Sequence, residues 1–305
     1  MINQMDQQLK VFVTVAEKKN FSRAAEALYM TQPAVSQYIR ILEENIGVRL
    51  LERTNKYVNL NQAGEIVYHH AKEIIGLHTR MQLLVDDLIN QATGPISIGA
   101  SYTFGEYVLP YIIATMKEIY PDIHPVVNIG NTAKIAYEVM HHQLDIGIVE
   151  GHFKQEKKLN VETFAEDEMV IVANPSHPYA KNSHNITIQD LENETWLLRE
   201  AGSGTREAIE KMFQQQGITP TEKIEFGSTQ PIKMGIEAGL GISLLSKWAI
   251  QKEVNNGNLQ ILNTDGMPFT RQFSFLTASP FQTKALRVFI ELIRQKELTA
   301  ITNNK

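Results

Sequence analysis

Apolar positions along the first 50 residues recur at helical spacing and predict three short helices separated by turns. The first helix has an apolar face formed by Leu9, Phe12, Val13 and Ala16. Ser22 is the expected N-cap of the second helix and Thr31 that of the third, which has Pro33 in its first turn and Gly47 at its end. Two short helices joined by a tight turn, the second with small and polar side chains near its start, are typical of a helix-turn-helix DNA-binding domain.

The third helix is the expected recognition helix, and residues 48–60 after it alternate and then turn, as in a β-hairpin wing. Glutamine and arginine can bond base edges bidentately, and small residues let a helix approach the major groove closely. Basic side chains on a wing can reach phosphates. The predicted DNA-contacting residues are Ser22, Arg23, Thr31, Gln32, Pro33, Ser36, Gln37, Arg40, Arg53 and Lys56. A three-helix domain that ends in a hairpin and binds no DNA is the alternative interpretation.

The next helix is long, from about residue 62 to residue 91, and its apolar positions have the period of a coiled coil rather than of a helix lying on its own domain. The seam consists of Val67, Ala71, Ile74, His78, Met81, Val85 and Leu88. Such a seam needs a partner helix, so we expect a dimer that presents two recognition helices to a two-fold symmetric operator. We interpret His78 as a packed or rim residue. Thr93, Gly94 and Pro95 end the helix and mark a domain boundary.

Beyond Pro95 predicted strands and helices alternate, which indicates an α/β sandwich of the parallel-sheet type. The predicted strands cover residues 96–100, 124–129, 145–149, 168–173, 195–198, 224–226 and 242–245. The predicted helices cover residues 105–120, 133–141, 204–216 and 230–238. In such folds ligands bind beyond the carboxyl ends of the strands, where loops meet helix N-termini.

Several loops at these strand ends are rich in hydroxyl groups and glycine. Free N–H groups and the positive end of a helix dipole make such a loop an anion-binding cup. The predicted effector-binding residues are Ser101, Tyr102, Thr103, Asn131, Thr132, Gly202, Ser203, Gly204, Thr205, Arg206, Thr229 and Gln230. Arg199 or Arg206 could supply positive charge. Glu150 is a poor neighbour for an anion, so we expect it to orient Arg206 or to lie outside the pocket. An ordinary helix cap is the alternative interpretation of the loop at residues 199–206.

The composition of the chain excludes several classes of protein. The chain has 305 residues, which suits one small and one larger domain, and 21% charged residues argue against disorder. No apolar run reaches the roughly 18 residues that a membrane helix needs, and we expect a cytoplasmic protein. There is no cysteine, so disulfides and thiolate metal sites are excluded. The net charge is −5, but residues 1–65 hold eight basic and seven acidic residues, so DNA contact depends on where the charges lie.

The N-terminal motifs resemble the signature of LysR-type transcriptional regulators. The resemblance is carried by FSRAAEAL at residues 21–28, TQPAVS at 31–36, ILEE at 41–44, IGVRLLER at 46–53, Leu60 and the pair Ala63-Gly64. The family usually has phenylalanine where Leu51 stands, arginine at Lys56 and threonine at Asn61. Asn61 can still cap the next helix, and Lys56 can still meet a phosphate.

The resemblance implies a domain plan and a set of partners. The implied plan is a winged helix-turn-helix domain at 1–61, a dimerising linker helix at 62–92 and a two-lobed effector domain at 95–305 similar to periplasmic binding proteins. Lobe I is expected at about 95–166 and 267–305, and lobe II at about 167–266. Implied partners are double-stranded promoter or operator DNA, a small-molecule effector, the chain itself as homodimer to homotetramer, and RNA polymerase, with activation of a neighbouring operon. The loop at 199–206 also resembles the sulfur-assimilation branch, with carbon-fixation regulators close by, which implies a small oxyanion or acidic metabolite as effector.

Other functions are weaker interpretations. Neither Ser101 nor Ser203 lies in a G-x-S-x-G elbow, and the adjacent pair His141-His142 is not at metal-ligand spacing. Gly239-Leu240-Gly241 lacks the rest of a dinucleotide fingerprint. We therefore expect no enzyme, no cofactor, no metal and no membrane partner. A constitutive or architectural DNA-binding regulator with a vestigial cleft is the remaining alternative.

Overall fold

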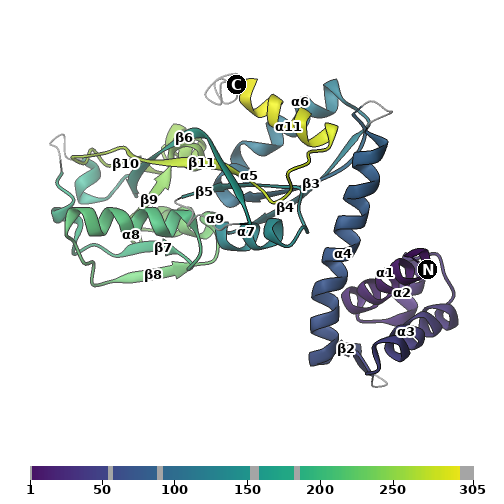
Figure 1. The fold of residues 1–305 in the computed structure, drawn as a ribbon. Helices are drawn as coiled ribbons and strands as arrows, with labels where there is room; N and C mark the ends of the chain where they lie inside the picture. The colour runs from purple at the N-terminus through teal and green to yellow at the C-terminus, as the bar shows by residue number, and fades with distance from the viewer. Residues whose placement is uncertain (1, 54–57, 88–91, 152–157, 182–185, 296–305) are drawn as a thin grey trace. The chain divides into compact units, whose positions relative to one another are not determined.

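The computed structural model describes residues 2–53, 58–87, 92–151, 158–181 and 186–295. The chain divides into two compact units, Met1–Asp86 and Asp87–Lys305. Figure 1 shows that the first unit is helical apart from a small hairpin, and that the second mixes strands with helices. Among the described residues, no helix is both long enough and apolar enough to span a membrane.

The first unit is a three-helix domain with a hairpin and a long helix. Its elements are α1 (Ile2–Lys18), α2 (Phe21–Ala27), α3 (Gln32–Ile46), β1 (Leu51–Arg53), β2 (Val58–Leu60) and α4 (Gln62–Asp86). The strands β1 and β2 pair antiparallel, which forms the wing predicted after the third helix. Apolar faces of the helices meet in one core, where Phe12, Val35 and Ile39 are fully buried.

Helix caps follow the prediction for α3 and differ from it for α2. The Thr31 side chain accepts a hydrogen bond from a backbone N–H in the first turn of α3, and Gly47 ends the helix with a φ of +85°. The N-cap of α2 is Asn20, whose side-chain oxygen accepts from the backbone N–H of Arg23. The prediction of Ser22 as this cap is wrong. Asparagine caps as well as serine does, so the sequence offered two equivalent caps two residues apart.

One part of the apolar seam of helix α4 packs on its own domain, and another part is exposed to solvent. Asn61 caps the helix as predicted, since its side-chain oxygen accepts from the backbone N–H of Gly64 at 2.8 Å. Ala71 is buried in the core of the first unit. The exposed positions farther along are Ile74, Met81 and Val85. Leu88 lies outside the described residues. The first part of the seam therefore packs on its own domain, and only the later part is open to a partner.

The second unit contains the remaining elements. Its strands are β3 (Gly94–Ser101), β4 (Ile123–Gly130), β5 (Ile146–Glu150), β6 (Asn160–Ala173), β7 (Trp196–Arg199), β8 (Lys223–Phe226), β9 (Ser243–Ser246), β10 (Gln260–Ile261) and β11 (Phe269–Thr277). Its helices are α5 (Tyr102–Tyr107), α6 (Leu109–Ile119), α7 (Thr132–Met140), α8 (Gly204–Gln216), α9 (Thr229–Glu237), α10 (Lys247–Asn255) and α11 (Lys284–Gln295), with short 3-10 helices at Pro178–Lys181 and Gln189–Leu191. The single helix predicted for 105–120 is broken at Val108, one residue before the turn that contains Pro110.

The main sheet is mixed rather than parallel. Seven strands belong to it, in the order β10-β6-β11-β5-β3-β4, with β9 also paired to β6. The pairs β3–β4 and β3–β5 of this sheet are parallel, as predicted, and so are β7 and β8, which form a separate two-stranded sheet. The predicted strands at 168–173 and 242–245 pair antiparallel as β6 and β9, so the prediction of a parallel sheet is wrong for them. Strands β10 and β11 are also antiparallel to their neighbours and lie outside the predicted strands. Apolar runs are the same in both arrangements, and the direction of a strand depends on where its connection crosses the sheet.

Two long strands join the parts of the second unit. Most of β6 pairs with β11, while its last residues, from Met169 to Val172, pair with β9 (Figure 1). Separate apolar cores lie on the two sides of this link. One core packs β3, β5 and β11 against α6 and α11, and another packs β6, β7 and β9 against α8. Both crossing strands therefore contribute residues to the two cores.

Candidate functional site

The outward face of α3 carries the predicted DNA-contacting side chains. Val35 and Ile39 point into the core, which leaves Gln32, Gln37 and Arg40 exposed on the opposite face. A groove of about 1020 Å³ runs beside this face, lined by Pro33, Ser36, Gln37, Arg40, Glu43, Glu44, Gly47, Val48, Arg49 and Leu51. The face is therefore polar and open to solvent, as a recognition helix must be to enter the major groove.

Hydrogen bonds and ion pairs within this face orient the side chains and leave them exposed to solvent. The Gln32 amide donates to Ser36 Oγ at 2.9 Å, and Arg40 Nε lies 3.3 Å from a Glu44 carboxylate oxygen. Ser22 and Arg23 are exposed on α2. The two predicted phosphate contacts on the wing are Arg53, whose backbone ends β1, and Lys56, which lies outside the described residues.

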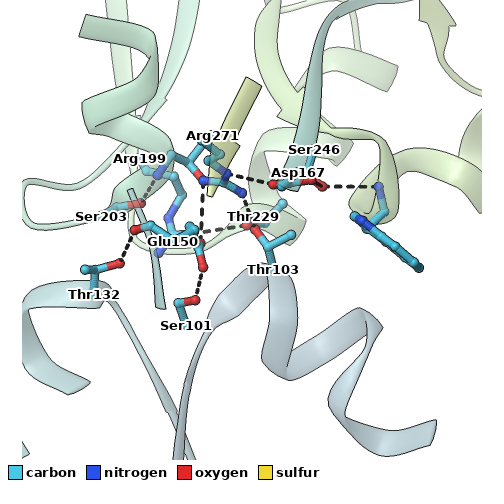
Figure 2. Close-up of polar contacts among 12 residues, drawn as sticks. Ser101, Thr103, Thr132, Glu150, Asp167, Arg199, Ser203, Thr229, Ser246 and Arg271 are labelled. Carbon is cyan, nitrogen blue, oxygen red and sulfur yellow. Dashed lines mark hydrogen bonds and ion pairs between the residues drawn. The ribbon is translucent and has the colours of Figure 1, made fainter. Parts of the chain in front are cut away.

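The predicted effector loops of the second unit meet in one buried polar cluster (Figure 2). We define the polar cluster as Ser101, Thr103, Thr132, Glu150, Asp167, Arg199, Ser203, Thr205, Thr229 and Arg271, all of which are buried. Its hydroxyl groups come from the starts of α5, α7, α8 and α9, and its charged groups come from β5, β6, β7 and β11. The carboxyl ends of several strands thus converge where the fold is expected to hold a ligand.

Arg271 is held by groups from four different elements. Its Nε donates to Asp167 Oδ2 at 2.7 Å, and its two terminal nitrogens donate to the hydroxyls of Thr205 at 3.1 Å and Thr103 at 3.0 Å. One of these nitrogens also lies 3.6 Å from a Glu150 carboxylate oxygen. Arg271 and Asp167 are directly opposed on β11 and β6, so strand register positions the pair. A buried guanidinium with this many acceptors is fully compensated.

Arg199 has a second, separate set of partners. Its Nε and one terminal nitrogen donate to the Glu200 carboxylate at 2.7 and 2.9 Å, and the other terminal nitrogen donates to Thr229 at 3.1 Å. The guanidinium carbon lies 4.3 Å from the centre of the Tyr102 ring. Burial alone would raise the pKa of Glu200, but the hydrogen bonds and charge of Arg199 outweigh it and hold this pKa below its ordinary value.

Glu150 lies inside the cluster, between these two arginines. Ser101 Oγ donates to its carboxylate, and Thr132 Oγ1 donates to its backbone carbonyl at 3.1 Å. Burial raises the pKa of Glu150 above its ordinary value, and the charge of Asp167 adds to this, although Arg271 opposes it. The contacts described for Glu150 are with Ser101, Thr132 and Arg271 rather than with Arg206, and Glu150 is not among the residues that line the cavity beside the loop before α8.

Arg206 lies at the edge of the cluster instead of within it. Its guanidinium contacts Glu210 and Glu225 at 2.5 and 3.3 Å and donates to the backbone carbonyl of Arg199 at 3.0 Å. Those carboxylates come from the exposed faces of α8 and β8, which draws the Arg206 side chain away from Glu150. The charge that sequence reasoning assigned to Arg199 or Arg206 comes to the cluster from Arg199 and Arg271.

The other predicted effector residues surround the cluster. Asn131 caps α7 and its amide donates to Glu200 at 3.2 Å. A cavity of about 810 Å³ adjoins the loop before α8, lined by Thr132, Ala133, Ala136, Tyr137, Met140, Leu159, Ala201, Gly202, Ser203, Gly204, Arg206, Glu207 and Glu210. Gln230 is exposed at the start of α9 and is not part of the polar cluster. The loop at Gly202–Gly204 therefore has one face on the cluster and one on an open cavity.

Sequence reasoning missed Arg271 and Asp167. Both lie in the middle of strands, where alternation predicts only whether a side chain is buried. Glu168, which begins a predicted strand, is exposed, so Asp167 and Arg271 are inward-facing charges in their strands. A buried charge needs a partner of opposite sign, so one acidic and one basic inward-facing residue indicate that the two strands pair.

Among the described residues, one group of side chains could hold a metal ion. His69, His70 and Glu73 on α4 have ligand atoms within 4.8 Å of one another. His70 Nδ1 lies 2.9 Å and His69 Nε2 lies 3.7 Å from the Glu73 carboxylate. The group is only partly buried and is far along the sequence from the polar cluster, so it adds nothing to the chemistry of that site.

Both the N-terminal and the C-terminal part of the chain match models of known protein families. Residues 7–65 match the family model described as bacterial regulatory helix-turn-helix protein, lysR family, and residues 90–297 match the LysR substrate binding domain. The chain is 36% identical over 287 residues to the HTH-type transcriptional regulator CysL of Bacillus subtilis, with 94% of this chain and 95% of that protein covered.

Two further similarities bear on the effector domain. A probable RuBisCO transcriptional regulator of Trieres chinensis is 31% identical over 290 residues, with 93% of this chain and 94% of that protein covered. The solved regulatory domain of Synechocystis CcmR, in complex with 2-PG, matches 70% of this chain and 99% of its own with a TM-score of 0.61 and 28% identity. The full length of the chain thus has counterparts among regulators.

Proposed function

Because the chain belongs to the LysR family of transcriptional regulators, we propose that its effector domain binds a small oxyanion or acidic metabolite at the polar cluster. The protein is a DNA-binding regulator with an effector-binding second unit. The observation that supports an anionic effector is the meeting of six hydroxyl groups and two guanidinium groups at the starts of four helices. Such donors stabilise negative charge strongly where water is excluded.

The similarity to the CcmR regulatory domain supports the same class of effector. That domain was solved with 2-PG, and its similarity covers 70% of this chain. We place the effector against Ser101, Thr103, Thr132, Ser203 and Thr205, with Arg271 behind them. Relatives that regulate RuBisCO fit a role in carbon or sulfur assimilation.

The remaining parts of the proposal concern assembly. The exposed part of the α4 seam supports self-association as a dimer, and two such dimers would form the homotetramer. A regulator of this kind acts in the cytoplasm on promoter DNA, and we propose activation through contact with RNA polymerase. We propose the domain limits 1–61, 62–92 and 95–305 for these functions.

The test of the proposal is thermal unfolding of the full chain against a panel of inorganic oxyanions and small acidic metabolites. A ligand that binds only the native form raises the free energy of unfolding by about 2.7 kcal/mol at a hundredfold excess over its Kd. We expect one class of anion to raise the unfolding temperature of the second unit. The fluorescence of Trp196 and Trp248 reports this unit alone, because the chain holds only these two tryptophans.

The double variant Ser203→Ala, Thr205→Ala should lose this stabilisation while operator binding without effector stays unchanged. Ser203 caps α8 and Thr205 accepts from Arg271, so both hydroxyls lie where an anion would bind. Thr219→Ala is the matched control, because Thr219 is exposed beyond the end of α8. Stabilisation of the double variant equal to that of the wild type would exclude this loop as the effector site.

A constitutive regulator is the second candidate, and one observation favours it. Every charged group of the polar cluster already has a partner within the protein, so the cluster is complete without a ligand. A panel in which no anion raises the unfolding temperature, together with operator binding that no metabolite alters, would support this candidate over the first.

Gln32→Ala should weaken binding to one operator by about 1–3 kcal/mol and relax the preference for one base pair. Gln32 is exposed at the start of α3, and its amide has the donor and acceptor that read a base edge. The measurement is binding of the full chain to the operator and to its single-base variants at fixed salt. Asn45→Ala, near the other end of α3, is the control. An equal loss on all sequences would show that Gln32 contacts only the backbone of DNA.

A further inference from the structure

The Glu150 carboxyl occupies the place in the polar cluster where an oxyanion would find its donors. Ser101 Oγ donates to it, the Thr103 hydroxyl is hydrogen-bonded to it, and an Arg271 nitrogen lies 3.6 Å away. Two hydroxyls and a guanidinium are the groups that hold a bound sulfate or phosphate in proteins. The protein therefore supplies its own carboxylate to these donors.

The start of α8 lies against the same residue. A Cβ atom added to Gly204, the first residue of this helix, would lie 2.2 Å from the Glu150 carbonyl oxygen and 2.9 Å from Glu150 Cγ. The positive end of a 13-residue helix thus borders the Glu150 side chain. Ser203, which caps this helix, lies between the cluster and the adjoining cavity. An anion that enters from the cavity reaches Thr132 and Gly204, and both of these residues contact Glu150.

Charged groups around Glu150 are already balanced. Arg271 on β11 pairs with Asp167 on β6, and Arg199 on β7 pairs with Glu200. The elements α5 and α7 present the hydroxyls of Thr103 and Thr132, and α8 presents the Glu207 carboxylate next to Gly151. No positive charge among these groups remains for a second anion. An incoming oxyanion beside an ionised Glu150 would be repelled.

We propose that Glu150 determines which effectors this site accepts, because an oxyanion binds only when Glu150 carries a proton and gives up its donors. This inference rests on the proposed function. Ser101 and Arg271 then donate to the oxyanion instead of to Glu150. One proton passes from solvent to the Glu150 carboxylate for each anion bound, so the net charge of the cluster stays constant with a monoanion and becomes more negative by one with a dianion such as sulfate.

The direction of the pH effect follows from this linkage. Burial raises the pKa of Glu150, so the folded protein takes up a proton at this group more readily than the unfolded chain does. The stabilisation from the neutral group is full below the ordinary pKa of a glutamate and is lost as pH rises through the raised value. Anion affinity should follow the same course, strong in acid and weak in alkali.

The experiment is calorimetric titration of the full chain with inorganic sulfate at about pH 5.5, about pH 7 and about pH 8.5, since the charge of sulfate is constant over this range. We expect wild-type affinity to fall by up to about tenfold for each unit of pH above the pKa of Glu150. Glu150→Gln keeps the shape and the acceptor for Ser101 but cannot ionise. Its sulfate affinity should be independent of pH and at least about tenfold above that of the wild type at the highest pH.

Glu291→Gln is the control, because it removes one carboxylate from the exposed face of α11 and should follow the wild type. A flat pH profile in the wild type overturns the inference without any variant, so the test holds even if Glu150→Gln fails to fold. Equal affinity and equal pH dependence in wild type and Glu150→Gln also overturn it, but leave an anionic effector in place. Absence of sulfate binding to both proteins at every pH counts against the anionic effector itself.

Discussion

Replacing Arg271 by methionine should lower the free energy of unfolding of the second unit by about 3–5 kcal/mol. The guanidinium is buried and pairs with Asp167 at 2.7 Å and with Glu150 at 3.6 Å. Its removal leaves two buried carboxylates without the positive charge that compensates them, and it also removes the donor to Thr103. Methionine fills a similar volume, so the loss measures charge compensation and not a cavity.

The measurement is denaturant unfolding followed by tryptophan fluorescence, which reports the second unit. Arg294→Met is the matched control: Arg294 pairs with Glu162, and both side chains are about half exposed, so this loss should stay below about 1 kcal/mol. Adding Asp167→Asn to Arg271→Met should restore part of the stability, because it neutralises the carboxylate that was left unpaired. Equal losses for Arg271→Met and Arg294→Met would show that the cluster contributes no more than a surface ion pair.

Gly204→Ala should destabilise the second unit by about 3 kcal/mol and abolish stabilisation by any anion that binds the polar cluster. The added Cβ would lie 2.2 Å from the backbone carbonyl oxygen of Glu150, a contact that only a shift of α8 away from β5 can relieve. That shift moves Ser203 and Thr205 away from Arg271. The effect therefore links the packing of one methyl group to the geometry of the polar cluster.

Gly227→Ala is the control for the change of residue type, because nothing lies within 4 Å of a Cβ added there. We expect a change within about 0.5 kcal/mol, or a small gain from the less flexible unfolded chain. Thermal unfolding of both variants with and without the stabilising anion separates the two effects. A Gly204→Ala protein as stable and as responsive as Gly227→Ala would show that α8 can move freely against β5, and that the cluster tolerates this movement.

Local sequence patterns were enough to predict the helices and the wing of the DNA-binding unit. The apolar period of residues 9–16, the cap at Thr31 and the stop at Gly47 lie within one element each, so short-range hydrogen bonds and burial of one face determine them. The error at Ser22 has the same origin, since Asn20 is an equally good cap two residues away. The motifs at residues 21–53 identified the family for the same reason, because they stand together in the sequence.

The loops that meet at the polar cluster were also predictable in part. Helices α7, α8 and α9 begin close to where hydroxyl and asparagine residues predict caps, and those residues face the cluster or its edge. Their convergence follows from the rule that carboxyl ends of neighbouring parallel strands share one edge of a sheet. The partners of each hydroxyl do not follow from this rule.

Only the tertiary structure determined which charged residues meet in the polar cluster. Arg271 and Asp167 are separated by 104 residues and become neighbours because β11 returns antiparallel to β6 in one particular register. A shift of β11 by one residue relative to β6 would turn the Arg271 side chain to the face opposite Asp167. Register depends on the apolar cores packed on both sides of these strands, which no local pattern encodes. The sequence by itself therefore determined the family, the helices and the loops, while long-range strand pairing determined that Glu150 and Arg271 lie together in the site.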